Sequence, residues 1–327
     1  MEQVAVVAKI QIAPMMGWTD QHFRYWMRLL SPDVLNYSEM VTTGALLYGD
    51  RARYLQRHDA EGAVILQLGG SCPDALARCA VFGQEYGYAG INLNVGCPST
   101  RVQAGKIGAC LYKDPVLVAS CVEAMVQAVD IPISVKCRIG VDDVDGLAHL
   151  VDFLQKMHEK SCHSVQLHAR KAWLKGLNPK QNRSIPPLEY DFAYQASQKV
   201  LGLPIILNGG LNDRASMEKQ LGRFPGVMLG RVAYMHPLMV RAIAMQVYPS
   251  SDYKSLDNML SDYLNYVVDA HECGHRLSVL TKPLFNLCRG QAYAKKWKKS
   301  LMAFSGKRQD VHKLIDIWRQ MTIKIPV

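Results

Sequence analysis

The sequence predicts a closed (β/α)8 barrel of the TIM type, followed by a small all-helical domain. Short apolar segments alternate with amphipathic helical segments, eight such strand candidates occur before residue 230, and only helical periodicity remains after residue 248. An open doubly wound sheet is the alternative, but it is typically marked by a GxGxxG turn after the first strand, and residues 13–17 read APMMG. We therefore expect a barrel domain at 1–248 and a helical domain at 249–327.

The barrel strands are expected where short apolar runs are bounded by turn residues. In chain order they are 10–15, 34–38, 64–68, 90–95, 131–138, 164–168, 204–208 and 226–229. The clearest helix begins after Asp114, a favourable N-cap residue, with Pro115 in its first turn. Its apolar face comprises Val118, Cys121, Val122, Met125 and Val129.

Two apolar stripes at helical spacing follow the turn-rich segment 249–252. They are Leu256, Leu260, Leu264 and Val267, and then Ala294, Trp297, Leu301 and Phe304. Lys295, Lys298 and Lys299 lie on the opposite face of the second helix. Segment 291–308 carries six cations and no acid, which favours nucleic-acid contact over a merely solvated face.

The composition is that of a globular chain, with 49% hydrophobic and 20% charged residues. No apolar run reaches the roughly 18 residues of a membrane span, and the N-terminus lacks the cations of a signal peptide. The nine cysteines form no CxxC pair, which fits reduced thiols, so we expect a cytoplasmic protein. The net charge of +10 is compatible both with a polyanionic partner and with a merely basic protein.

Polar residues stand in or directly after the predicted strands, and in a barrel of this type the carboxyl ends of all strands meet at one mouth. Each residue alone has a structural explanation, but their convergence is hard to attribute to packing. The set is Pro14, Met15, Met16, Glu39, Gln67, Asn92, Asn94, Cys97, Lys136, Arg138, His168, Arg170, Asn208, Gly209, Gly210, Gly230 and Arg231.

The ends of the seventh and eighth strands favour a phosphate site. Their glycines expose backbone N–H groups, and Arg231 adds positive charge. Lys136 and Gln67 are expected deeper in the mouth, where a cation and an amide can stabilise the negative charge of a reduced isoalloxazine. These features favour FMN as the resident cofactor.

Cys97 lies in the turn at 96–99, directly after a predicted strand. Gly96 lets the chain bend and Pro98 restricts the backbone beyond the sulfur. A lone cysteine is most often a small buried apolar residue, but the position at the mouth favours a chemical role.

The segment 169–187, which we call the basic loop, follows the sixth strand and contains no acid. Loops of this length inside a compact domain are usually functional, and its charge favours phosphate contact over a solvated excursion. Its cations are Arg170, Lys171, Lys175, Lys180 and Arg183, interspersed with Trp173 and Asn182.

His271, Glu272 and His275 form a literal HExxH, a motif typical of zinc proteases. We reject this interpretation and expect no metal. Gly274 interrupts the helix, no third histidine follows at a suitable spacing, and the next acid is Asp310.

Together these motifs resemble those of the tRNA-dihydrouridine synthases, which are FMN-dependent reductases of uridine in tRNA. The resemblance is carried by APMMGWTD (13–20), YSEMVTTGA (37–45), LQLGG (66–70), INLNVGCPS (91–99), VKCRIG (135–140), LHARKAW (167–173), LNGG (207–210) and LGR (229–231). Residues 37–47 and 168–190 are most similar to the bacterial subfamily that modifies uridines 20 and 20a of the D loop.

The resemblance implies an FMN site made of Pro14, Met15, Met16, Gln67, Lys136, His168, Asn208, Gly209, Gly210, Gly230 and Arg231. NADPH, or NADH, would reduce FMN; its N5 would deliver hydride to C6 of a flipped uridine while Cys97 donates a proton to C5 from the opposite face. The expected tRNA contacts are Asn94, Arg138 and Arg170, the loop residues Lys180, Asn182 and Arg183, and Lys295 and Lys298.

Two other functions stay open at this stage. An FMN barrel that reduces a free pyrimidine, similar to dihydroorotate dehydrogenase, explains the mouth but not the basic loop and helix. A non-catalytic RNA-binding barrel explains the charge, but the presence of Cys97, Lys136 and His168 argues against it.

Overall fold

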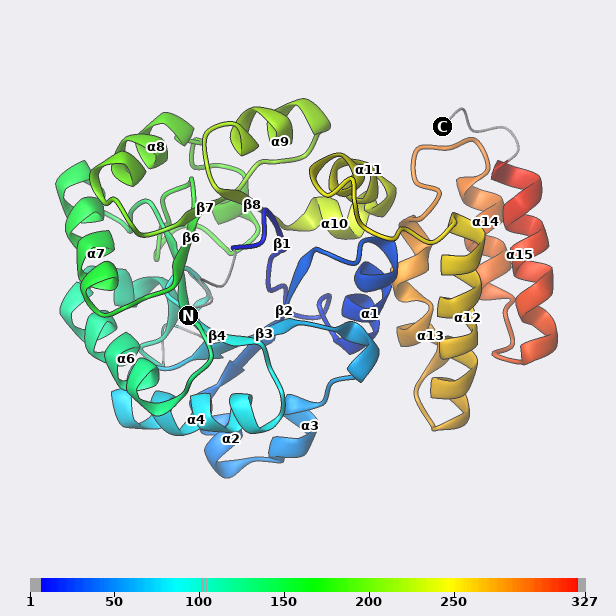
Figure 1. Cartoon of the computed structure of the whole chain (residues 1–327), viewed down its shortest axis with the longest axis horizontal. Coiled ribbons are helices and arrows are strands. Elements are labelled where there is room, and N and C mark those ends of the chain that lie inside the picture. Colours follow the sequence, from blue (N-terminus) through cyan, green and yellow to red (C-terminus); the bar gives the residue numbers. More distant parts are fainter. Residues whose placement is uncertain (1–6, 101–102, 104, 323–327) are drawn as a thin grey trace. The chain divides into compact units, whose positions relative to one another are not determined.

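The computed structural model describes residues 7–100, 103 and 105–322, and its eight strands form a closed parallel barrel in sequence order (Figure 1). The predicted barrel is therefore confirmed. The strands are β1 (Ile10–Ile12), β2 (Leu35–Thr42), β3 (Val64–Gly69), β4 (Gly90–Asn94), β5 (Ile133–Arg138), β6 (Ser164–His168), β7 (Ile205–Asn208) and β8 (Gly226–Leu229).

The strand boundaries differ most from the predicted ones in β1 and β2. β1 ends at Ile12, just before Pro14, which has no N–H for a strand ladder. β2 continues to Thr42, and its register with β3 shifts between Tyr37 and Met40. Glu39 consequently lies within this strand rather than after it.

Packing divides the chain into two compact units. The first comprises residues up to Thr19 together with Leu35–Gly230, and the second comprises Asp20–Val34 together with the chain from Arg231 onward. The proposed domain boundary between residues 248 and 249 falls inside the second unit and stays a prediction.

The first unit surrounds its strands with helices (Figure 1). They are α2 (Thr43–Tyr48), α3 (Arg51–Leu55), α4 (Pro73–Glu85), α6 (Pro115–Ala128), α7 (Leu147–Glu159), α8 (Tyr190–Lys199) and α9 (Arg214–Leu221), with short 3-10 turns at Asp59–Glu61, Gly108–Lys113 and Gln181–Arg183. The predicted helix after Asp114 is α6: the Asp114 carboxylate accepts a hydrogen bond from the Leu117 N–H at 3.0 Å. Alternation along the strands separates an apolar outer face from a polar interior, because Ile91 and Leu93 are in the apolar layer whereas Asn92 makes hydrogen bonds inside the barrel.

The second unit is helical among the described residues. Its helices are α1 (Gln21–Leu30), α10 (Arg231–Met235), α11 (Pro237–Val247), α12 (Leu256–Glu272), α13 (Leu277–Leu280), α14 (Ala294–Met302) and α15 (Arg308–Thr322), with a 3-10 turn at Lys282–Asn286. Trp297 anchors α14: it is fully buried, its indole N–H donates to the carbonyl of Leu284 at 2.8 Å, and it packs edge-on against Trp318. The two predicted apolar stripes thus lie on α12 and α14.

No described helix combines the length and apolarity that crossing a membrane requires.

Removing the indole of Trp297 should destabilise the second unit. Trp297→Ala empties a fully buried site and removes one of the donors to the Leu284 carbonyl, which keeps the Leu287 N–H, so we expect a loss of about 3–5 kcal/mol in the free energy of unfolding. Urea unfolding followed by tryptophan fluorescence measures this change. Lys296→Ala on the exposed face of the same helix is the control, expected within about 0.5 kcal/mol of the parent; equal effects of the two changes would contradict the assigned packing.

Candidate active site

A chain of hydrogen-bonded amides crosses the interior of the barrel. Gln67 donates through Nε2 to Oδ1 of Asn92 at 2.7 Å, and it accepts at Oε1 from Nδ2 of Asn94 at 2.9 Å. Asn92 in turn donates to Oε1 of Gln166 at 2.8 Å and to Oγ of Ser134 at 3.0 Å. These side chains are buried, so an amide left without a hydrogen-bond partner would cost folding free energy. The hydrogen-bond network therefore fixes the relative positions of β3 to β6.

Asn94 extends this network to Cys97. Its Oδ1 accepts hydrogen bonds from the backbone N–H groups of Gly96 at 3.1 Å and Cys97 at 3.0 Å. The carbonyl of Cys97 accepts from Ala109 N–H at 2.9 Å, and its side chain is half-buried. The turn that carries the thiol is therefore held from both sides. The predicted contact of Asn94 with the substrate stays a prediction.

The turn does not require Gly96 in the way that the sequence suggested. Its backbone is not in the left-handed region. A Cβ at this position would lie 3.4 Å from the carbonyl oxygen of Lys136, which is ordinary van der Waals contact, so the packing against β5 does not require glycine here either.

Lys136 and Asn208 meet across the barrel mouth. The ammonium group of Lys136 donates to Oδ1 of Asn208 at 3.0 Å, and Nδ2 of Asn208 donates to the carbonyl of Met228 at 2.7 Å. Burial, with a smaller contribution from the neighbouring charge of Arg138, lowers the pKa of Lys136 to about 8. A bound anion would stabilise this partly desolvated cation.

His168 lies at the end of β6, opposite Asn208 in the strand register. Burial and the nearby cations Arg138, Lys136 and Arg170 hold its pKa well below the usual value, so the imidazole is neutral at pH 7. A Cβ at Gly209 would overlap this ring. Glycine at this position therefore lets the loop after β7 contact the imidazole.

The loop after β1 brings Pro14, Met15 and Met16 to the mouth of the barrel. Pro14 and Met15 are half-buried, whereas Met16 is 67% exposed. The carboxylate of Glu39 accepts from the N–H groups of Gly17 and Trp18, which fixes the path of this loop.

The strand ends fit a phosphate-bearing cofactor. Gly209 and Gly210 have φ values of +107° and +69°, a conformation that favours glycine. Within the described residues, no acceptor is assigned to the backbone N–H groups of Gly209, Gly210 and Gly230, and such groups bind phosphate oxygens. Arg231 follows as the exposed first residue of α10 in the second unit, and its contact with phosphate stays a prediction.

Arg138 is engaged with the backbone. The residue is 3% exposed. Its Nε donates to the carbonyl of Gly96 at 3.0 Å, and Nη1 donates to the carbonyls of Lys171 at 3.2 Å and Asn182 at 2.9 Å. Burial lowers its pKa to about 10, so it stays charged at pH 7. The sequence predicted a contact of Arg138 with the substrate, and it did not predict these hydrogen bonds to the Cys97 turn and to the basic loop.

Asn182 has a role within the basic loop, and its predicted contact with tRNA stays a prediction. This side chain is fully buried and closes the basic loop on itself: Oδ1 accepts from Trp173 N–H at 2.8 Å, and Nδ2 donates to the carbonyls of Trp173 at 2.9 Å and Leu177 at 3.0 Å. Direct contact with RNA would break these bonds. Asn182 therefore supports the loop rather than presenting a group on its surface.

The cations of the basic loop differ in their surroundings. Lys175, Lys180 and Arg183 are exposed. Lys171 instead forms an ion pair with Asp145 at 2.6 Å and lies over the ring of Trp173, and Arg170 donates to the carbonyl of Pro186. The exposed cations are therefore better placed for a polyanion.

The lysines of α14 form a continuous exposed face. Lys295, Lys296, Lys298 and Lys299 are exposed, and no ion pair is assigned to them within the part of the chain that the structure describes.

The HExxH segment has a different geometry from a zinc helix. The helix α12 ends at Glu272 and His275 lies beyond it, where the carbonyl of His275 is hydrogen-bonded to Nδ1 of His271 at 2.9 Å.

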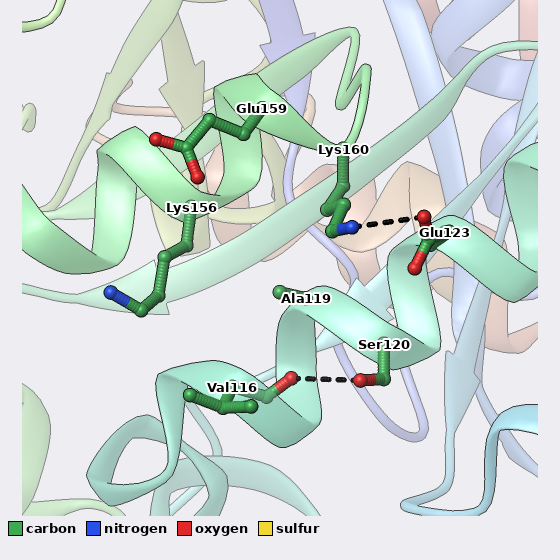
Figure 2. A pocket seen from close by; sticks show the side chains of 7 residues that line it. All are labelled: Val116, Ala119, Ser120, Glu123, Lys156, Glu159 and Lys160. Carbon is green, nitrogen blue, oxygen red and sulfur yellow. Dashed lines mark hydrogen bonds and ion pairs between the residues drawn. The ribbon is translucent and has the colours of Figure 1, made fainter.

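A depression on the outside of the barrel lies between α6 and α7 (Figure 2). Its volume is about 240 Å³, and its charged lining includes an ion pair of 2.9 Å between Lys160 and Glu123. The lining contains none of the strand-end side chains. This depression is therefore separate from the candidate active site.

Comparisons with known proteins identify the family of this chain. The family model described as dihydrouridine synthase (Dus) matches residues 11–322. The tRNA-dihydrouridine(20/20a) synthase of Shewanella oneidensis is 45% identical over 291 residues, covering 89% of this chain and 87% of its own. The enzyme of the same name from Synechocystis sp. is 44% identical over 293 residues, covering 89% and 88%, and that of Pseudomonas aeruginosa is 42% identical over 313 residues, covering 95% and 92%.

Solved structures with the same barrel share little sequence with this chain. TcOYE with pHBA superposes with a TM-score of 0.51 at 13% identity, covering 74% of this chain and 89% of that one. Morphinone reductase in complex with tetrahydroNAD also gives 0.51, at 11% identity and coverage of 77% and 90%. These structures support the fold alone. The family match and the full-length relatives confirm the resemblance seen in the motifs, and the chain belongs to the dihydrouridine synthase family.

Proposed function

We propose that this protein reduces uridines of tRNA to 5,6-dihydrouridine, with FMN as resident cofactor and NADPH as reductant, and that it acts at positions 20 and 20a of the D loop. The observation that carries the proposal is the half-buried thiol of Cys97, which Asn94 holds at the barrel mouth that also contains Lys136, His168 and Asn208. The names of the relatives support the substrate. Modification of tRNA also favours a cytoplasmic location.

The candidate cofactor residues divide by chemistry. The N–H groups of Gly209, Gly210 and Gly230 would bind the phosphate, with Arg231 as a further cation. Lys136 would compensate negative charge on the ring, while Gln67, held by Asn92 and Asn94, supplies an oriented amide near it. The remaining predicted residues of this site are Pro14, Met15, Met16, His168 and Asn208.

The reduction requires a hydride and a proton at neighbouring carbons of the uracil ring. FMN, when bound and reduced by NADPH, would supply the hydride to C6. Cys97 would donate the thiol proton to C5, so that the C5–H bond forms as the S–H bond breaks. Arg138 and Lys136 interact electrostatically with Cys97, so both cations would stabilise the thiolate that remains.

The target uridine must leave its stack to reach the mouth, because its ring is otherwise inaccessible. Exposed cations of the basic loop, Lys180 and Arg183, would bind phosphates beside the flipped nucleotide, with Arg170 nearer the mouth. The lysine face of α14 would contact tRNA elsewhere, through Lys295 and Lys298. The helical domain, proposed at 249–327, would thus contribute to binding and the barrel to both binding and chemistry.

Removing the thiol should slow turnover strongly without affecting binding. We expect Cys97→Ala to lower the rate of dihydrouridine formation by about 10²–10⁴-fold, since it deletes the proton donor. Flavin absorbance and tRNA affinity should stay at wild-type levels. Mass spectrometry of digested tRNA gives the rate, and Cys72→Ala, at an exposed cysteine, is the control. A wild-type rate of dihydrouridine formation in Cys97→Ala would show that Cys97 is not the proton donor.

The buried charge of Lys136 should be visible in the stability of the flavin-free protein. Its folded-state pKa of about 8 lies below the usual lysine value of 10.5, so the unfolded chain binds more protons between these values and the contribution of Lys136 to stability rises with pH. Lys136→Met lacks this rise. Its free energy of unfolding relative to wild type should therefore fall by about 2–3 kcal/mol between pH 7 and pH 10.

Urea unfolding at the two pH values measures this difference. Lys199→Met, at an exposed position on α8, should show no such change. If the difference in unfolding free energy between Lys136→Met and wild type did not depend on pH, the lowered pKa assigned to Lys136 would be wrong.

Reversing charge on α14 should weaken tRNA binding in a salt-dependent manner. Lys295→Glu with Lys298→Glu removes two exposed cations, so the slope of log affinity against log salt should become shallower by about 2. Filter binding at salt concentrations of about 50 to 200 mM gives the slope, because phosphate contacts dominate the affinity in this range. The matched control is Lys199→Glu on α8 combined with Lys219→Glu on α9. If the α14 variant gave a slope as steep as that of this control, α14 would not be part of the RNA-binding surface.

A further inference from the structure

Two side chains connect the turn that carries Cys97 to the basic loop. The first is Arg138, whose guanidinium joins the carbonyl of Gly96 to the carbonyls of Lys171 and Asn182. Gly96 directly precedes Cys97, whereas Lys171 and Asn182 belong to the basic loop. A single buried cation thus holds both segments.

The second connection is Gln103, which lies C-terminal to the turn. Its Nε2 donates to the carbonyl of Pro98 at 2.9 Å and to the carbonyl of Leu174 at 3.1 Å. Pro98 directly follows Cys97, and Leu174 lies in the basic loop. The side-chain amide of Gln103 therefore also connects the turn to the basic loop, but on the C-terminal side of Cys97, whereas Arg138 connects them on its N-terminal side.

The part of the basic loop that receives these bonds is well fixed. The Leu174 peptide is held on both sides, because its N–H donates to Oδ1 of Asp142 at 2.8 Å while its carbonyl accepts from Gln103. The buried side chain of Asn182 closes the loop across Trp173. Hydrogen bonds within the loop and from the loop to the turn thus restrict movement of one segment relative to the other, so we expect the two to move together.

We propose that Gln103 is a positioning residue that, together with Arg138, clamps the Cys97 turn to the basic loop. The clamp flanks the thiol through the peptides at Gly96 and Pro98. It couples the placement of the thiol to the loop that presents Lys180 and Arg183 to RNA phosphates. This inference rests on the proposed function for the role of the RNA, but the clamp itself is a property of the protein alone.

Gln103 can be tested more cleanly than Arg138, because it carries no charge and is only half-buried. Gln103→Ala removes both hydrogen bonds. Gln103→Glu keeps the size of the side chain but replaces its two N–H donors with a carboxylate, which repels the carbonyls of Pro98 and Leu174. Gln195→Ala, at an exposed position on α8, is the matched control.

The first measurement needs no RNA and no turnover. Alkylation of Cys97 by iodoacetamide, followed by peptide mass spectrometry of the flavin-loaded protein, reports how firmly the turn is held, with exposed Cys72 as internal reference. Both Gln103 variants should alter the Cys97 rate several-fold, on the scale of one or two lost hydrogen bonds, without altering the Cys72 rate. Wild-type alkylation of Cys97 in both variants would overturn the clamp.

The second measurement separates positioning from binding. At saturating tRNA, both Gln103 variants should form dihydrouridine about tenfold more slowly than wild type and Gln195→Ala, with KM changed less than about twofold. A raised KM with unchanged kcat would instead make Gln103 a binding residue and contradict the proposal. If wild-type protein forms no dihydrouridine, the proposed function fails, and the alkylation rates still decide the clamp.

Discussion

The closed parallel barrel imposes the constraint on which the site depends, because it delivers the carboxyl ends of eight strands to one mouth. The barrel alone does not orient the side chains there. That task falls to the amide chain through Asn92, Gln67 and Asn94, which joins neighbouring strands and ends on the backbone N–H of Cys97. The thiol therefore takes its position from the interior of the barrel, although it lies in a turn.

The electrostatics of the mouth follow from the same burial. Desolvation lowers the pKa values of Lys136 and Arg138, and together with the nearby cations it keeps His168 neutral. The mouth thus holds positive charge that water compensates incompletely. Such a site favours anionic groups, among them the thiolate that Cys97 would become in the proposed reduction of a uracil ring.

The sequence predicted the eight strands and the residues at their ends, because hydrophobic periodicity and the order of elements determine both. It could not predict what those side chains contact. Arg138 and Asn182 were expected to contact tRNA. The hydrogen bonds of Arg138 to loop carbonyls depend on the distance between segments far apart in the chain, and those of Asn182 depend on the conformation of the loop itself. Gln103 carried no sequence signal at all, since its two acceptors are backbone carbonyls at residues 98 and 174.

The most direct test of the account is to incubate the purified, flavin-loaded protein with NADPH and tRNA that lacks dihydrouridine, and to map the product by nuclease digestion and mass spectrometry. We expect a gain of about 2 mass units, the two added hydrogens, at D-loop uridines 20 and 20a and at no other position. A yellow, folded protein that binds tRNA but leaves these uridines unchanged would contradict it.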